Sequence, residues 1–528
     1  MVEIFDTTLR DGTQQEGVTY STGDKLNIVQ KLDSLGIDYI EGGWPGSNPK
    51  DIEFFEEAQK LELNKIKIVA FGSTRRPGVK VEDDKNLREI VTAGVKTAAI
   101  FGKSWDLHVQ EALDTNLNEN LNMINSSIKF LKGRGLEVIF DAEHFFDGFA
   151  ANKEYALQVI KEAESAGADR LVLCDTNGGF LPQQIRKIIR TVQEFVDIPL
   201  GIHAHNDGGL AVANSLAAVD EGVSHVQGTI NGYGERCGNA NLCNVIPNLE
   251  LKKGYQVLGE DKLKKLTSTA RYVSELGNLN PPTSEPYVGE SAFAHKGGIH
   301  VSAIMKNPET YEHITPGKVG NQRRVLVSEL SGKSNLLYKA EELDLNIKEN
   351  GELEEILERV KKLEHEGYNF EGADASFKLL IERMRGEHTR LFQLENVKIF
   401  TDKTGEGKPK SEAIIKVRVE EQKIHTAAEG VGPVNALDKA LRKALINFYP
   451  ALDDIYLLDY KVRVIDSSEG TAAQVRVLVK SSNGSENWGT VGVSTNIIEA
   501  SWQAVVDSVE YGIRLQMDNF EKAAVKST

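Results

Sequence analysis

Residues 155–177, YALQVIKEAESAGADRLVLCDTN, are the stretch that decides the fold. The first part, Tyr155–Ala166, has the apolar spacing of an amphipathic helix. Gly167 suits the left-handed conformation found at helix C-termini. Arg170–Thr176, which is apolar from Leu171 to Cys174, is typical of a strand that is buried on both faces. We therefore interpret the stretch as one helix–glycine–strand unit.

The same order recurs over the first 250 residues. Strand, helix and glycine repeated to eight strands predict a (β/α)8 barrel. The alternative is an open doubly wound sheet, which is disfavoured because no G-x-G-x-x-G follows the first strand. The eight candidate strands are Val2–Thr8, Ile37–Gly43, Ile66–Gly72, Thr97–Gly102, Glu137–Glu143, Arg170–Thr176, Leu200–Asn206 and His225–Asn231.

The later part of the chain has a different organisation. The alternation stops after about residue 260, and Asn278–Thr283 (NLNPPT) is typical of a linker. We expect the (β/α)8 catalytic barrel at residues 1–260. Helical subdomains packed on or beside the barrel are expected at 261–390, and a separate α+β domain at 391–528.

The predicted C-terminal domain contains an internal duplication. Residues 394–400 (LENVKIF) resemble 458–464 (LDYKVRV), and 412–419 (EAIIKVRV) resemble 472–479 (AAQVRVLV). Each copy is predicted to form strands followed by a helix. Neither copy contains a cluster of catalytic residue types, so we expect this domain to serve assembly or regulation.

The composition limits the partners. The chain of 528 residues has a net charge of -16 and a pI of about 5.3, which disfavours nucleic acid or an anionic membrane as the main partner. Its three scattered cysteines give no disulfide framework, as expected in a reducing compartment. No apolar run reaches the roughly 20 residues of a membrane span, and Met1–Asp6 lacks the basic segment of a signal peptide. We therefore expect a cytoplasmic protein.

Polar and ionisable residues stand at the C-terminal ends of the predicted strands. In a (β/α)8 barrel these ends form the rim that holds the active site. The candidates follow strands one, five, six, seven and eight, within Asp6–Gly12, Asp141–His144, Cys174–Gly178, His203–Asp207 and Asn231–Asn239.

Within these stretches, His203 and His205 form an H-x-H on the seventh strand, so both side chains point to one face. Two imidazoles beside a carboxylate make a divalent metal site. Asp11 is the natural carboxylate ligand, and Asn239 offers a neutral oxygen. The alternative is a pair of hydrogen-bonded structural histidines. The set leaves positions for water and a chelating substrate, and an oxygen-rich six-coordinate geometry favours Mg or Mn, while the two histidines keep Zn possible. The lack of a thiolate argues against a closed structural zinc site.

Four further residues are candidates, and three of them have two interpretations each. Arg10 would hydrogen-bond a carbonyl oxygen that gains negative charge, or form a salt bridge that positions Asp11. Glu143 would accept a proton or orient a base, or belong to a structural ion pair. Thr176 offers a hydroxyl to a substrate carboxylate, or caps the following helix. His300 lies in a glycine-containing loop beyond the barrel, where a catalytic role is one interpretation.

Four motifs together resemble the 2-isopropylmalate/homocitrate/citramalate synthase family. They are DTTLRDG at 6–12, HAHND at 203–207, GYGERCGN at 232–239 and GIH at 298–300. The resemblance covers nearly the whole chain. The duplicated C-terminal segment is similar to the regulatory dimerisation domain of that family.

The resemblance implies roles for individual residues. Arg10 would stabilise the keto oxygen, and Thr176 would hold the carboxylate of a 2-keto acid. Glu143 and His300 would act in acid–base steps, with Tyr311 assisting. The implied metal ligands are Asp11, His203, His205 and Asn239.

Two stretches indicate which keto acid is the acceptor. Residues 41–51 (EGGWPGSNPKD) and 101–105 (FGKSW) depart from the isopropylmalate synthase pattern and are similar to the long-chain citramalate synthase branch. Trp44 at a strand end would shrink the pocket and favour a methyl over an isopropyl group. The resemblance therefore implies that acetyl-CoA joins pyruvate to give (R)-citramalate and CoA, the first step of a pyruvate route to 2-oxobutanoate and isoleucine.

The same branch implies a homodimer whose C-terminal domain senses isoleucine. The alternative is a 2-isopropylmalate synthase, which uses 2-oxoisovalerate in leucine biosynthesis. A lyase or carboxyltransferase on the same barrel would share motifs of this kind, but the C-terminal duplication argues against it. A catalytically inactive binding protein would be expected to lose a ligand or Arg10, and neither is lost.

Overall fold

The computed structural model describes residues 2–328, 332–343, 345, 347, 350–403, 407–465 and 470–526. The chain forms two compact units. The first comprises Met1–Phe293 and Ile314–Arg323, and the second comprises Ala294–His313 and Arg324–Thr528.

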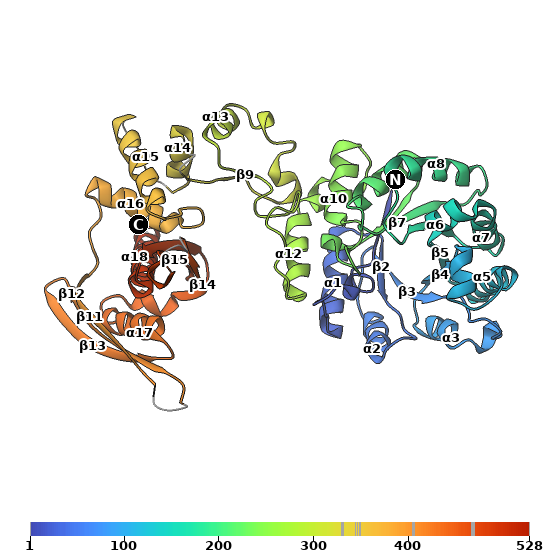
Figure 1. Ribbon diagram of the computed structural model, residues 1–528, viewed down its shortest axis with the longest axis horizontal. Coiled ribbons are helices and arrows are strands. Elements are labelled where there is room, and N and C mark those ends of the chain that lie inside the picture. Colours follow the sequence, from blue (N-terminus) through green and yellow to red (C-terminus); the bar gives the residue numbers. More distant parts are fainter. Residues whose placement is uncertain are drawn as a thin grey trace. The chain divides into compact units, whose positions relative to one another are not determined.

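The first unit is built on a closed barrel of eight parallel strands (Figure 1), so the predicted (β/α)8 architecture is confirmed. Strand β1 pairs with both β2 and β8, which closes the sheet. The strands are β1 Glu3–Asp6, β2 Tyr39–Gly43, β3 Lys67–Ser73, β4 Thr97–Lys103, β5 Glu137–Glu143, β6 Arg170–Asp175, β7 Leu200–Ala204 and β8 His225–Gly228.

Helices surround the strands, and their ends follow local sequence signals. Helix α1 begins with a capping box between Ser21 and Asp24 and ends at Gly36, whose φ of 95° requires the left-handed region. The helices of this unit are α1 Thr22–Leu35, α2 Pro49–Ala58, α3 Lys85–Thr92, α4 Asp106–Glu111, α5 Leu117–Lys132, α6 Phe145–Ala151, α7 Lys153–Ser165, α8 Pro182–Gln193, α9 Ala211–Asp220, α10 Leu242–Pro247, α11 Glu260–Leu263 and α12 Leu266–Leu276.

Each strand has two buried faces, which explains the continuous apolar runs in the sequence. In β6, Leu171 and Leu173 point outward and join the large cluster between the strands and the helices. Val172 and Cys174 point inward and join the cluster inside the barrel. The barrel is therefore packed along its axis, and polar side chains are concentrated at its ends.

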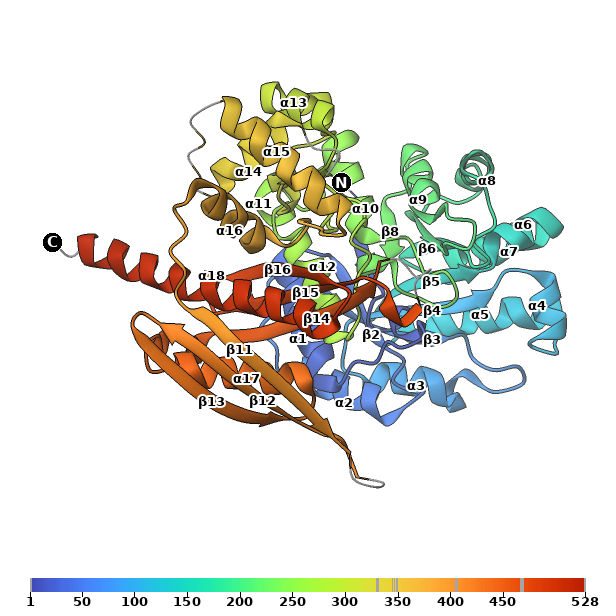
Figure 2. The same ribbon diagram turned by 60° about the vertical axis from the view of Figure 1, so that its left-hand side comes forward.

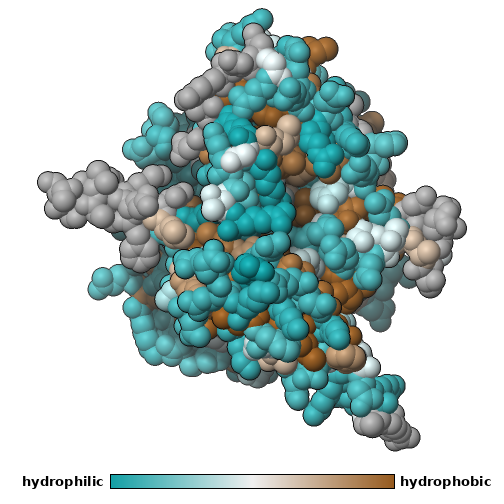
Figure 3. All heavy atoms as spheres, turned by 90° about the vertical axis from the view of Figure 1, so that its left-hand side faces the viewer, coloured by the Kyte–Doolittle hydropathy of each residue, from teal (hydrophilic) through white to brown (hydrophobic). Residues whose placement is uncertain are grey.

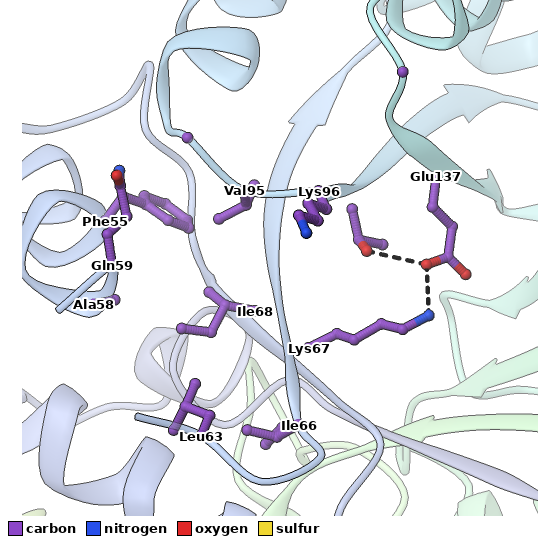
Figure 4. A pocket seen from close by; sticks show the side chains of 13 residues that line it. Phe55, Ala58, Gln59, Leu63, Ile66, Lys67, Ile68, Val95, Lys96 and Glu137 are labelled. Atoms are coloured by element: carbon purple, nitrogen blue, oxygen red, sulfur yellow. Dashed lines mark hydrogen bonds and ion pairs between the residues drawn. The ribbon is translucent and has the colours of Figure 1, made fainter. Parts of the chain in front are cut away.

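A pocket opens at the N-terminal ends of β3, β4 and β5. Figure 4 shows apolar side chains such as Phe55 and Val95 on its wall, and Glu137 accepting hydrogen bonds from Lys67 and Thr97. Residues at this end of a (β/α)8 barrel serve stability, since the active site lies at the opposite rim. The chemistry is therefore expected at the C-terminal ends of the strands.

The second unit begins with helices and ends with the duplicated segment (Figure 2). Its first part contains the short parallel strands β9 Ala294–His295 and β10 Arg324–Val325. The helices of this part are α13 Gly298–Lys306, α14 Lys333–Glu342, α15 Asn350–His365 and α16 Asp374–Arg385.

The duplication is confirmed as two copies of three antiparallel strands followed by a helix. Helix α17 packs on the first sheet and α18 on the second (Figure 2). The first copy is β11 Gln393–Asp402, β12 Lys410–Val419, β13 Gln422–Gly430 and α17 Pro433–Leu445. The second is β14 Tyr456–Val464, β15 Val475–Ser482, β16 Asn487–Ser494 and α18 Ile497–Lys526.

The structure corrects the residue-by-residue match between the two copies. A bulge interrupts β11 before Asn396 and β14 before Asp459. Lys416 pairs with Asn396, and Lys480 pairs with Asp459, so Lys416 and Lys480 are equivalent. The alignment of residues 412–419 with 472–479 instead matches Lys416 with Arg476. The sequence match is therefore shifted by an even number of residues. Such a shift keeps the alternation of inward and outward side chains along the strand, so the alternation does not reveal it.

Among the described residues, no helix combines the length and the apolar character needed to cross a membrane.

Candidate metal centre and active site

Three potential metal ligands converge at the C-terminal rim of the barrel. Asp11 lies in the turn after β1, His203 is on β7, and His205 directly follows β7. Their ligand atoms all lie within 4.8 Å of one another, and all three residues are buried. Asn239 forms an isolated backbone bridge with His205, so the loop after β8 brings its side chain to the same place. The predicted set is thus brought together.

The spacing of these atoms fits a divalent metal. Nε2 of His203 lies 3.5 Å from Oδ2 of Asp11 and 3.4 Å from Nε2 of His205. Nε2 of His205 lies 3.9 Å from the same Asp11 oxygen. The point in their plane that is equidistant from the three atoms is about 2.1 Å from each, which is a normal bond length for zinc or magnesium. Oδ1 of Asp11 and Oδ1 of Asn239 are also buried without a hydrogen-bond partner among the described residues.

The protonation states suit metal binding, which needs a carboxylate and neutral imidazoles. Burial would raise the pKa of Asp11, but Arg10, the two histidines and Asn239 together lower it to about 2. Burial, together with the neighbouring His203, lowers the pKa of His205 to about 4, and burial also lowers the pKa of His203. All three side chains are therefore in the ligating form at neutral pH.

Arg10 is held by three contacts beside the ligand cluster. Its Nε donates to Oε2 of Glu41 at 2.6 Å, and its Nη1 donates to Oδ2 of Asp11 at 3.1 Å. Its Cζ lies 3.8 Å from the centre of the Phe71 ring. Burial would lower the pKa of Arg10, but Glu41 and Asp11 raise it. The guanidinium is therefore permanently charged and fixed in direction.

Two buried carboxyl groups next to this site have no role in the sequence-based predictions. Burial raises the pKa of Glu41 to about 7 and that of Asp141 to about 8. Glu41 is fully buried within β2, and Asp141 is buried on β5. The signal that could have found them is an acidic residue inside an otherwise apolar strand, as in Tyr39–Gly43 (YIEGG).

An aromatic wall stands beside Arg10. The Phe71 and Phe101 rings stack at 5.5 Å, and the Trp44 ring meets both edge-on at 5.6 and 5.8 Å. Nε1 of Trp44 donates to Oδ1 of Asn86 at 2.5 Å, which fixes the indole. We call Trp44, Phe71 and Phe101 the aromatic wall.

Glu143 and Thr176 lie at the ends of β5 and β6. Glu143 forms an ion pair with Lys103 of β4. Oγ1 of Thr176 accepts a hydrogen bond from the backbone N–H of His144 at 2.9 Å. Thr176 does not cap the following helix, because α8 begins at Pro182 with Leu181 as its N-cap residue.

His300 and Tyr311 belong to the second unit. His300 is exposed on α13, so the predicted placement in a loop is wrong. Its ring stacks on Tyr311 with the ring centres 4.1 Å apart. The predicted residues therefore fall into two groups, one on the barrel rim and one in the second unit.

Comparison with known protein families divides the chain into three matched segments. Residues 1–273 match the HMGL-like family. Residues 287–368 match the homocitrate synthase post-HMGL domain-like family, and residues 371–513 match the LeuA allosteric (dimerisation) domain.

Curated relatives match over almost their full length. An (R)-citramalate synthase of Geobacter sulfurreducens is 55% identical over 513 residues, which cover 97% of both chains. An (R)-citramalate synthase of Aquifex aeolicus is 54% identical over 97% of both chains. A probable 2-isopropylmalate synthase of Methanopyrus kandleri is 32% identical over 98% of this chain and 99% of its own. With these matches and a barrel rim that carries the expected residues, the chain belongs to the (R)-citramalate synthase family.

Proposed function

We propose that the protein condenses acetyl-CoA with pyruvate and releases (R)-citramalate and CoA. The observation that carries this proposal is the buried cluster of Asp11, His203 and His205 beside the fixed guanidinium of Arg10. The identity of 54–55% with (R)-citramalate synthases over 97% of the chain supports the choice of reaction.

The proposed chemistry develops negative charge on the ketone oxygen of the acceptor. A divalent metal held by Asp11, His203, His205 and Asn239 supplies Lewis acidity toward that carbonyl when it is bound. Arg10 donates hydrogen bonds from a direction that Glu41 has already fixed, so little reorganisation is needed as the charge appears. The protein thus stabilises the oxyanion with a pre-oriented cation.

Proton transfers need further groups. One base removes a proton from the acetyl methyl group, the resulting enolate carbon attacks the ketone carbon, and the new alkoxide takes up a proton. Water then cleaves the thioester and releases CoA. We assign acid–base roles to Glu143, His300 and Tyr311. The His300–Tyr311 stack supports a joint role for these two residues.

Thr176 is the proposed ligand of the keto-acid carboxylate. Its oxygen already accepts from the His144 backbone, which orients the hydroxyl. Among the described residues its proton has no acceptor, so the hydroxyl is free to donate to a carboxylate. That arrangement suits an anionic substrate.

The aromatic wall supports pyruvate as the acceptor. Three large rings beside Arg10 leave less room for the alkyl group of the keto acid, which favours a methyl group. The second candidate function is 2-isopropylmalate synthesis from 2-oxoisovalerate. The similarity to the Methanopyrus kandleri protein supports this alternative.

Two oxygen ligands from the protein and open positions for substrate and water oxygens make Mg or Mn our proposed metal, with Zn as the alternative because two ligands are histidines. We place the reaction in the cytoplasm, as the first step of a pyruvate route to 2-oxobutanoate and isoleucine. We also keep the division into a catalytic barrel (1–260), linking helical subdomains (261–390) and a regulatory domain (391–528) as a proposal.

Homodimerisation through the duplicated segment is part of the proposal. The outer strands β11 and β14 expose large apolar side chains, and Figure 3 shows hydrophobic patches on the face formed by this part of the chain. Such a surface is expected to be covered by a second copy. The exposed residues include Val397, Phe400, Tyr456, Leu458, Val462 and Val464. The matched family is described as allosteric, which supports a regulatory role for this domain. We propose isoleucine as the effector because the reaction is the proposed first step of a route to isoleucine.

Product analysis tests the reaction. Purified protein, acetyl-CoA, pyruvate and Mn²⁺ should yield citramalate, identified by mass spectrometry and chiral chromatography, with one free thiol per product. The His203→Ala variant is the matched control and should yield none. Thiol release without citramalate would mean thioester hydrolysis alone and would refute the proposed condensation.

A further inference from the structure

We propose that Gln227 is a positioning residue that keeps His203 in the tautomer with the proton on Nδ1, so that Nε2 is free to bind a metal. This inference rests on the metal site of the proposed function. Neither the sequence motifs nor the family resemblance assigns any role to Gln227.

The placement of Gln227 follows from the barrel itself. His203 of β7 and Gln227 of β8 are direct partners in the parallel sheet. Oε1 of Gln227 lies 2.8 Å from Nδ1 of His203, and both side chains are buried. Because the contact joins two adjacent barrel strands, backbone register holds it in place, and no mobile loop is involved.

The orientation of the Gln227 amide is decided at its other end. Nε2 of Gln227 donates to Oδ1 of Asp141 on β5 at 3.1 Å. Because the donor and the acceptor of an amide lie in one plane on opposite sides of the Cγ–Cδ bond, and Oδ1 of Asp141 is the acceptor at one of them, this contact turns Oε1 toward His203. An oxygen at 2.8 Å can only accept, so Nδ1 of His203 must be the donor. The imidazole proton is then on Nδ1, and the lone pair is on Nε2.

The free lone pair points where a metal would need it. Nε2 of His203 faces Oδ2 of Asp11 at 3.5 Å and Nε2 of His205 at 3.4 Å. The second histidine lacks such support, since Nδ1 of His205 is buried with no hydrogen-bond partner among the described residues. Gln227 is therefore the side chain that orders one imidazole of the pair, and its loss should weaken the site through His203.

Metal binding without substrates gives the first test. Mn²⁺ binding to the metal-free protein is followed by the loss of the free-ion electron paramagnetic resonance signal. Supporting hydrogen bonds of this kind typically change metal affinity about 10–100-fold, so the Gln227→Met variant should bind Mn²⁺ at least 10-fold more weakly. The Gln227→Glu variant still offers an oxygen to Nδ1 and should stay within about threefold of the wild type.

A matched control separates positioning from packing. Asn120 is another fully buried amide of the barrel unit, and it donates to Tyr155 and to the Lys103 carbonyl on the α5 side. The Asn120→Leu variant also removes a buried amide, yet its Mn²⁺ affinity should be unchanged. If the Gln227→Met variant is folded and binds Mn²⁺ as tightly as the wild type, the inference is overturned.

A second readout needs neither metal nor turnover. ¹⁵N nuclear magnetic resonance of histidine-labelled apoprotein distinguishes the two neutral tautomers, and a His203→Asn variant identifies the signal of His203. We expect a single Nδ1-protonated form in the wild type and a mixture in the Gln227→Met variant. An Nε2-protonated His203 in the wild type would overturn the inference. This readout is independent of the acceptor substrate, so failure of the proposed reaction alone would leave it intact.

Discussion

Replacing Arg10 by lysine keeps one positive charge at the barrel rim and changes its geometry. The guanidinium binds Glu41 at 2.6 Å and Asp11 at 3.1 Å while lying on the Phe71 ring. A lysine ammonium is a compact charge without a planar fork. It can reach one of the two carboxylates, and it then has no donor directed at the acceptor carbonyl. The Arg10→Lys variant thus tests the direction of the hydrogen-bond donors of residue 10 separately from its positive charge.

The magnitude follows from the role proposed for this side chain. Loss of one pre-oriented donor to an oxyanion lowers kcat by about 10²–10³, or about 2.7–4 kcal/mol in the activation barrier. We expect about a 100-fold loss for the Arg10→Lys variant, with kcat and kcat/KM falling together because the interaction strengthens in the transition state. The ionised Asp11 stays in place, so Mn²⁺ binding should change much less than turnover.

The assay is steady-state thiol release with acetyl-CoA, pyruvate and Mn²⁺, combined with thermal unfolding. Arg190→Lys is the matched control, because Arg190 pairs with Glu221 on the exposed side of α8 and its side chain is 67% exposed. We expect that control within twofold of the wild type, since surface ion pairs contribute about 0–1 kcal/mol. A folded Arg10→Lys variant with kcat within threefold of the wild type would refute the reasoning.

Metal removal and two further changes test the site and the domain arrangement. Chelation of the metal should abolish thiol release. Mn²⁺ at 100 times its Kd should raise the free energy of unfolding of the wild type by about 2.7 kcal/mol and leave that of the His203→Ala variant unchanged. An equal gain in both proteins would contradict the ligand assignment. The Trp44→Ala variant should raise kcat/KM for 2-oxobutanoate relative to that for pyruvate by about 10–200-fold, since one methylene in a pocket is worth about 1–3 kcal/mol. An unchanged ratio would show that the aromatic wall does not select the acceptor. Removal of residues 391–528 should abolish inhibition by isoleucine before it abolishes catalysis, so persistent inhibition of an active truncated protein would refute the regulatory assignment.

The barrel could be predicted because its strands are buried on both faces and alternate with amphipathic helices. Arg170–Thr176 (RLVLCDT) contributes leucines to the outer cluster and Val172 and Cys174 to the inner one, so its centre, Leu171–Cys174, is apolar on both faces. Polar residues then mark the strand ends, and this pattern by itself predicts that Asp11, His203, His205 and Asn239 lie together on the rim.

Contacts that depend on register could not be predicted in the same way. Glu41 on β2 lies near Arg10, which follows β1, and Gln227 on β8 lies near His203 on β7. Both contacts depend on which strands are neighbours in the barrel and on the register between them. In sequence, Glu41 is a single acidic residue in Tyr39–Gly43, and Gln227 is one of several polar residues in His225–Asn231. The match of residues 412–419 with 472–479 failed for a related reason, since alternation alone does not distinguish registers that differ by an even number of residues. The match of residues 394–400 with 458–464 is off by one, because Asn396 corresponds to Asp459.

The most direct test of the central claim is a thiol-release assay with acetyl-CoA and Mn²⁺ that compares pyruvate, 2-oxobutanoate, 2-oxoisovalerate and 2-oxoglutarate. We predict the highest kcat/KM with pyruvate, a smaller value with 2-oxobutanoate and little thiol release with the other two keto acids. A preference for 2-oxoisovalerate would contradict the role given to the aromatic wall and make the protein a 2-isopropylmalate synthase. Equal release without any keto acid would contradict the condensation itself.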